Sequence, residues 1–98
     1  MNSDNSPVAL IEKEDLEQLT FPSEEVLTNL TDKNERTEAL HRAASLGNLE
    51  KHKVRITFLD VDGVKEVFTT IWAVTNEKVV FKGGRLIPVN RILKVTYS

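Results

Sequence analysis

Two aspartates separated by one residue are the sharpest chemical feature of the sequence. Asp60 and Asp62 follow the apolar run at residues 56–59 and stand directly before Gly63. Paired carboxylates at the end of a strand can attack a phosphoryl group while binding magnesium. An aspartate followed by glycine is also the strongest short signal for a β-hairpin turn. The same residues therefore indicate either a phosphoryl-transfer site or a tight turn.

The stretch 56–63 resembles the first motif of haloacid-dehalogenase-like phosphatases, a hydrophobic strand that ends in Asp-x-Asp-Gly. The resemblance implies Asp60 as nucleophile and Asp62 as general acid. That family also needs a Ser or Thr after a second strand, a Lys and a further acidic pair, all on a doubly wound parallel sheet. Only 35 residues of the 98 follow Gly63, and none of them form a helical pattern. We therefore interpret Asp62-Gly63 as a hairpin turn and expect no enzyme activity.

The other motifs that could bind a ligand are weaker. A calcium loop aligned on Gly63 places Phe58 and Thr69 at the first and the bidentate ligand positions, where neither can serve. The run Lys-Gly-Gly-Arg at 82–85 could cradle a phosphate, but no helix follows it to add a dipole, so we predict a hairpin. The chain has 0 cysteines and 2 histidines, His41 and His52, which make a poor metal site. The sequence thus predicts no catalytic, cofactor-binding or metal-binding residue.

What remains is a binding surface made of cations and one tryptophan. The candidates are Arg55, Lys65, Trp72, Lys78, Lys82, Arg85, Arg91 and Lys94. Such cations could neutralise phosphates along a groove, or they could be solubilising residues on the outward face of the strands. Trp72 has apolar neighbours on both sides, which favours a core or half-buried position. If it is exposed instead, it could stack on nucleic-acid bases.

The elements that must position these residues divide the chain into two parts of opposite charge. The chain has 13 basic and 15 acidic residues, of which residues 1–40 hold 3 and 10, a balance of −7, and residues 41–98 hold 10 and 5, a balance of +5. Ninety-eight residues make one domain. We predict a disordered terminus at 1–7, an acidic and partly helical segment at 8–31, and a helix plus a small β-barrel at 32–98.

The segment 32–98 has the pattern of an α+β fold that is mainly β. A helix at 33–46 with a cap at Asp32 and an end at Gly47 comes first. Strands punctuated by turns follow, and the second, at 64–74, is too long to stay flat, so it should bend or carry a bulge. We expect one or more N-terminal helices followed by a five-stranded, strongly bent antiparallel sheet that forms a barrel.

The order and length of these elements over about residues 33–98 resemble Sm-like and SH3-like small barrels. The run Ile-Pro-Val-Asn-Arg-Ile-Leu-Lys-Val at 87–95 looks like the last two strands of such barrels. Further runs resemble a family of small uncharacterised bacterial proteins, which brings no known activity: Leu-Gly-Asn-Leu at 46–49, Lys-His-Lys-Val at 51–54, Thr-Thr-Ile-Trp-Ala-Val-Thr at 69–75, Lys-Gly-Gly at 82–84 and Ile-Pro at 87–88. The acidic residue followed by Met-Asn of the Sm base-binding loop has no match near residues 74–77, so we expect no uridine pocket.

These patterns favour a non-enzymatic binding or regulatory module whose partner is another protein or a second copy of the chain. The alternative is single-stranded nucleic acid, above all RNA, bound by the basic barrel surface and modulated by the acidic segment. No cofactor and no small-molecule substrate is predicted. The sequence has no run of about 18 apolar residues and no signal-peptide pattern, so we expect a cytoplasmic protein that does not contact a membrane.

Overall fold

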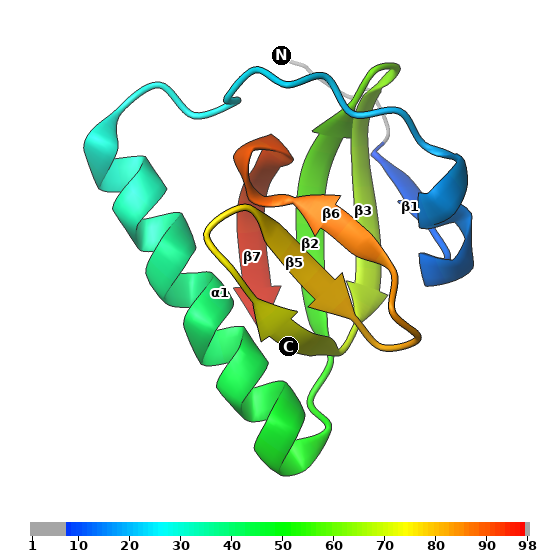
Figure 1. Cartoon of the computed structure of the whole chain (residues 1–98), viewed down its shortest axis with the longest axis vertical. Helices are drawn as coiled ribbons and strands as arrows, with labels where there is room; N and C mark the ends of the chain where they lie inside the picture. The colour runs from blue at the N-terminus through cyan, green and yellow to red at the C-terminus, as the bar shows by residue number, and fades with distance from the viewer. Residues whose placement is uncertain (1–7, 98) are drawn as a thin grey trace.

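The fold is one long helix beside two β-sheets (Figure 1). The computed structural model describes residues 8–97, so the terminus predicted at 1–7 lies outside the described residues. The four-stranded sheet has the order β1 (Ala9–Ile11), β3 (Gly63–Thr69), β2 (Val54–Asp60) and β7 (Ile92–Tyr97). The three-stranded sheet consists of β4 (Ile71–Val74), β5 (Lys78–Phe81) and β6 (Leu86–Pro88). With α1 (Leu30–Glu50) and the 3₁₀ helices η1 (Lys13–Gln18) and η2 (Val89–Arg91), the protein is α+β and mainly β.

The predicted five-stranded sheet is wrong, although the predicted bend is present. The long strand at 64–74 breaks at Thr70, and its halves β3 and β4 belong to different sheets. An extended strand of that length would span roughly 36 Å at about 3.3 Å per residue, which exceeds two of the three dimensions of a body measuring 40 × 30 × 26 Å. In the described part of the chain both sheets stay open with two edge strands each, so the strands do not close into a barrel.

The strand β1 is the element that the sequence pattern did not reveal. It is three residues long and pairs in parallel with β3, with Leu10 opposite Glu66. A segment this short shows no alternation of apolar and polar residues, and its partner lies more than fifty positions away in the chain. The result is a sixth and a seventh strand where five were expected: one from the break at Thr70 and one from β1.

The helix α1 is longer than predicted at both ends. Asn29, not Asp32, is its N-cap, and the Asn29 side chain accepts a hydrogen bond of 2.8 Å from the N–H of Asp32. Lys51 ends the helix in the left-handed conformation with φ 58°. Gly47, the predicted C-terminal signal, is buried inside the helix, where a Cβ atom would clash with the carbonyl oxygen of Ile71. This glycine serves close packing of α1 against β4 rather than the end of the helix.

The core lies between the two sheets and beneath α1. In β2 the side chains alternate, with Val54, Ile56 and Phe58 buried and Arg55 exposed. The other large side chains that are fully buried come from α1 and from the strands of both sheets: Leu40, Val67, Ile71, Val79, Phe81, Ile87 and Ile92. These side chains supply most of the apolar burial that stabilises so small a domain.

Residues 8–29, the part of the acidic segment 8–31 that precedes α1, belong to the fold. It runs from β1 through η1 and across one end of the sheets to the start of α1 (Figure 1). Leu16 is buried in the core, and the rings of Phe21 and Phe58 lie 5.8 Å apart. The carbonyl of Thr20 accepts from the N–H of Val61 at 2.9 Å. Residues 8–29 therefore contain the short helix η1 and pack on the sheets.

The one α-helix among residues 8–97 is too polar to cross a bilayer, and no other helix there is long enough.

Candidate interaction surface

The four-stranded sheet has one face on the core and one face on the surface. Residues opposite each other on neighbouring strands project from the same face. Arg55 pairs with Phe68 on β3 and with Thr96 on β7, which puts all three on one side of the sheet. We call this side the outer face; by the same register it comprises Leu10, Arg55, Thr57, Leu59, Val64, Glu66, Phe68, Lys94 and Thr96.

Apolar side chains are exposed on the outer face. Leu10 is 62% exposed, Phe68 41% and Val64 40%. Charged groups surround Phe68: the ammonium nitrogen of Lys53 and the guanidinium carbon of Arg55 each lie 5.8 Å from the centre of its ring. The outer face therefore offers an aromatic contact flanked by two cations.

The charge of the outer face is positive on balance. Arg55 pairs with Glu66 at 3.4 Å, and the Thr57 hydroxyl donates to the same carboxylate at 3.2 Å. Lys94 is exposed, and within residues 8–97 neither it nor Lys53 belongs to a salt bridge. Arg55 and Lys94 on the outer face, together with Lys53 beside it, thus stand against the one carboxylate of Glu66, in a surface suited to an anionic or acidic partner.

Of the residues predicted as a binding surface, Arg55 and Lys94 are brought together on the outer face, but two other cations are used inside the fold. Arg91 is 5% exposed, and its guanidinium donates to the carbonyls of Leu59 at 3.0 Å and Glu24 at 2.7 Å. Lys65 donates to both carboxylate oxygens of Asp60, at 2.8 and 2.9 Å. These two side chains hold the fold together and are not part of the exposed surface.

The other candidates belong to the three-stranded sheet or its turns. Lys78 and Lys82 are exposed, while Nε of Arg85 lies 3.1 Å from a carboxylate oxygen of Glu17 in η1. Trp72 is 47% exposed, which agrees with the half-buried position and not with the core position, the two that the sequence favoured. Ile71 is buried, so the ordinary alternation along β4 turns the indole of Trp72 outward. The shift in the pairing of β4 with β5 between Ile71 and Ala73 accompanies the exposure of Ala73 on the strand as well.

Asp60 and Asp62 form a hairpin turn, as predicted. The Asp60 carboxylate is 3% exposed and accepts from the N–H groups of Asp62 at 2.8 Å and Gly63 at 3.0 Å, besides Lys65. Burial would raise the pKa of Asp60, but these hydrogen bonds outweigh it, and the pKa lies below its ordinary value. Gly63 has φ 138°, which an L side chain rarely adopts. The carboxylate of Asp60 is thus occupied in stabilising the turn.

A second ion pair joins the acidic segment to α1. Arg36 is 8% exposed and donates to the two carboxylate oxygens of Glu25 at 2.7 Å each, and to the carbonyl of Ile92 at 3.1 Å. The hydrogen bonds from Arg36 lower the pKa of Glu25 to about 2. The sequence analysis did not find this pair. One signal was present: Arg36 is four residues before Leu40 and therefore lies on the apolar side of the helix, where side chains are buried.

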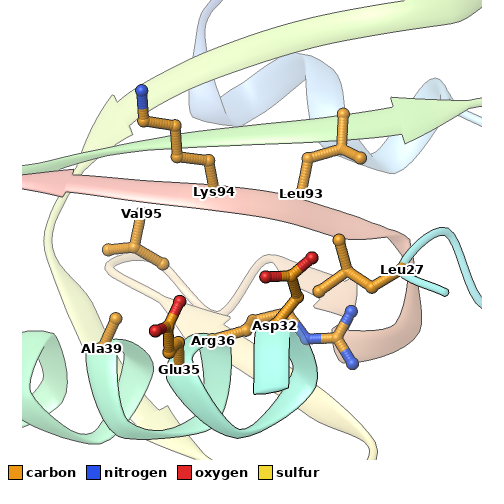
Figure 2. Close-up of a pocket in the computed structure, with 8 residues that line it drawn as sticks. All are labelled: Leu27, Asp32, Glu35, Arg36, Ala39, Leu93, Lys94 and Val95. Carbon is orange, nitrogen blue, oxygen red and sulfur yellow. The ribbon is translucent and has the colours of Figure 1, made fainter. Parts of the chain in front are cut away.

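Two hollows lie on the described surface, and the first of them adjoins the outer face at Lys94. One, of about 370 Å³, runs between α1 and β7 (Figure 2). The other, of about 470 Å³, lies between the segment 21–23, the turn at 76–78 and the end of β6. In residues 8–97 neither hollow contains a group of three His, Cys, Asp or Glu side chains able to hold a metal.

Comparison of the chain with models of protein families, with characterised proteins and with solved structures finds no match in any of the three. The function is therefore argued from the surfaces described above.

Proposed function

We propose that the protein is a non-enzymatic binding module that docks another protein on the outer face. The observation that carries this proposal is the exposure of Phe68 beside Lys53 and Arg55. Aromatic residues and arginine are enriched at the centres of protein interfaces, because they bury a large area and add hydrogen bonds or cation–π contacts. Leu10 and Val64 extend the apolar surface around this centre.

The charge of the outer face indicates what kind of protein it binds. Three cations against Glu66 favour a partner segment that carries carboxylates next to apolar side chains. Phe68 would supply the apolar contact and Arg55 a charge-assisted hydrogen bond. The partner would then cover a sheet face whose other side is already the core.

The arrangement of the elements supports a relation to small SH3-like barrels as part of the same proposal. A helix precedes the strands, the chain bends sharply between β3 and β4, and the 3₁₀ helix η2 leads directly into the last strand. In this interpretation, the small SH3-like barrel has a helix followed by strands. The acidic segment adds two further elements to it, β1 and η1.

Single-stranded RNA is the second candidate, and the exposure of Trp72 is the observation that favours it. Exposed aromatic rings flanked by cations can stack on bases while the cations contact phosphates. The protein partner is favoured because Arg91 and Lys65 are occupied inside the fold and the whole chain carries a net charge of −2. Fewer cations are therefore available to phosphates than the sequence indicates.

Affinity capture with matched variants tests the proposal. The immobilised protein, Phe68→Asp and Leu49→Asp are each incubated with nuclease-treated extract of the cells that express the chain. Leu49 is 82% exposed on α1 and lies outside the outer face, so its variant is the control for a new surface carboxylate. We expect a discrete protein retained by the wild type and Leu49→Asp and lost with Phe68→Asp.

Loss of the same protein from both variants would contradict the outer face as the docking site. An amide NMR titration with random single-stranded RNA decides the second candidate. Amide shifts at Phe68 and Trp72 that decrease as the salt concentration rises would favour RNA over a protein partner. The absence of shifts would exclude RNA as the ligand.

A further inference from the structure

The groove between α1 and β7 combines an unpaired strand edge with carboxylates. Its lining residues come from the loop before the helix, the first turns of the helix and the middle of the strand: Leu27, Asp32, Glu35, Arg36, Ala39, Leu93, Lys94 and Val95. Figure 2 shows the carboxylates of Asp32 and Glu35 reaching from α1 toward β7, with Leu27 at one end. Val95 points toward the helix, and the side chain of Lys94 points away from it (Figure 2).

The backbone of β7 is available on the groove side. β7 is the last strand of its sheet, and β2 pairs with only one of its edges. The far edge faces α1 (Figures 1 and 2). Arg36 donates to the carbonyl of Ile92 at the start of this edge. Beyond that point the groove runs along Leu93 to Val95, where an unpaired edge can accept another extended chain.

The charge in the groove is negative. Arg36 is neutralised by Glu25, and Lys94 directs its ammonium group elsewhere. Asp32 accepts one hydrogen bond, from the side chain of Asn29 at 3.0 Å, and both Asp32 and Glu35 are exposed. Within the described residues, no salt bridge involves Asp32 or Glu35. Two carboxylates therefore stand beside apolar groups of Leu27, Ala39 and Val95.

We propose that this groove binds an extended, basic segment of a partner protein, which adds as a strand beside β7 and places a Lys or Arg side chain against Asp32 and Glu35. Main-chain hydrogen bonds to β7 would supply affinity, and the carboxylates would select for basic side chains. The groove and the outer face share Lys94, but the groove uses the edge of β7 and one side of α1, whereas Phe68, the centre of the outer face, lies on β3 with β2 between.

Three synthetic peptides test the proposal on the isotope-labelled full chain by amide NMR titration. The first alternates Val and Lys over six residues, the second alternates Val and Glu, and the third is the Val-Lys peptide with alternate backbone nitrogens methylated. We expect the Val-Lys peptide alone to shift the amides of Leu93 to Val95 and of the first turns of α1. The methylated peptide keeps its charge but cannot complete a strand ladder, so binding through charge alone would show as equal shifts with both basic peptides.

Charge reversal in the groove provides the matched variants. Glu35→Lys should lower the affinity for the Val-Lys peptide by about tenfold, which corresponds to the loss of one charge-assisted contact. Glu50→Lys makes the same substitution fifteen residues along the same helix, roughly 22 Å away, and should leave the affinity within about twofold. Both positions are exposed, so neither change should unfold the protein.

Three outcomes would overturn the proposal: no shifts with the Val-Lys peptide at millimolar concentration, equal affinity for Glu35→Lys and wild type, or equal shifts with the methylated peptide. Phe68→Asp separates this site from the proposed function. It should abolish capture on the outer face and leave the titration of the groove unchanged, so either proposal can fail without the other.

Discussion

The N-terminal junction and the outer face use the same kinds of charged side chain in opposite ways. We define the junction as Glu24, Glu25, Arg36, Asn90 and Arg91, which join the acidic segment to the body of the fold. At the junction, Arg36 and Arg91 are buried and their guanidinium groups donate to a carboxylate or to main-chain carbonyls.

On the outer face, Arg55 and Lys94 are exposed, although Lys94 lies only three positions after Arg91. The difference is one of burial. When a buried cation is removed, its carbonyl or carboxylate partners lose their hydrogen-bond donor. When an exposed cation is removed, water can donate to its partners instead. The number of basic residues in a chain therefore overstates the surface available to a ligand.

Replacing Arg91 should have the largest effect on stability. Arg91→Met removes the donors to the carbonyls of Leu59 and Glu24 and should lower the free energy of unfolding by about 3 kcal/mol. Lys94→Met should change it by less than about 0.5 kcal/mol. Urea denaturation followed by circular dichroism measures both. Equal losses for the two variants would remove the distinction between junction and outer face.

Substitutions on the buried and the exposed face of α1 should also differ in their effect on stability. Gly47→Ala should lower the free energy of unfolding by about 2 kcal/mol, because the new Cβ would meet the carbonyl oxygen of Ile71. Asn48→Ala, on the exposed face, should stabilise the helix by a few tenths of a kcal/mol. Thermal unfolding of both variants checks the signs, and a more stable Gly47→Ala would show that α1 does not pack closely on β4.

The junction should also weaken in acid. The pKa of Glu25 falls from 4.5 to about 2 in the folded protein, so its contribution to stability is present above about pH 4.5 and is lost as the pH falls toward 2. At neutral pH, Glu25→Gln should cost about 1.5 kcal/mol. Urea unfolding from pH 7 to 2 should show the gap between wild type and variant closing over that interval. A gap that stays constant with pH would mean that the carboxylate charge contributes nothing.

The outer face should show the smallest effect on stability. Phe68→Asp and Arg55→Gln should each lower the free energy of unfolding by less than about 1 kcal/mol, because both side chains project away from the core and only strand propensity and exposed contacts are lost. The same urea titrations measure them. A loss comparable to that of Arg91→Met would make Phe68 part of the structural core and remove it as a docking residue.

Features set by neighbouring residues could be predicted from the sequence, and features set by distant contacts could not. The turn at Asp62-Gly63 and the bend in the strand at 64–74 depend on local signals and on length. The parallel pairing of β1, the burial of Arg91 and the pair of Glu25 with Arg36 each depend on segments that meet only in the folded chain.

Candidate site residues follow the same division. Arg55 and Lys94 could be placed on outward positions by the alternation of their strands. Trp72 could be placed only as core or half-buried, because its apolar neighbours on both sides show no alternation of apolar and polar residues that would fix the direction of the indole. The groove beside β7 has no local signal, since its carboxylates lie on the helix and its backbone edge lies some sixty residues later.

The measurement that tests the central claim most directly is site-specific photo-crosslinking in the cells that express the chain. A benzophenone side chain is placed at position 68 on the outer face or, as the control, at position 49 on α1. The account predicts one discrete adduct at position 68 that protease removes and nuclease leaves intact, with none at position 49. Identical adducts at both positions, or no adduct at position 68, would contradict a docking site centred on Phe68.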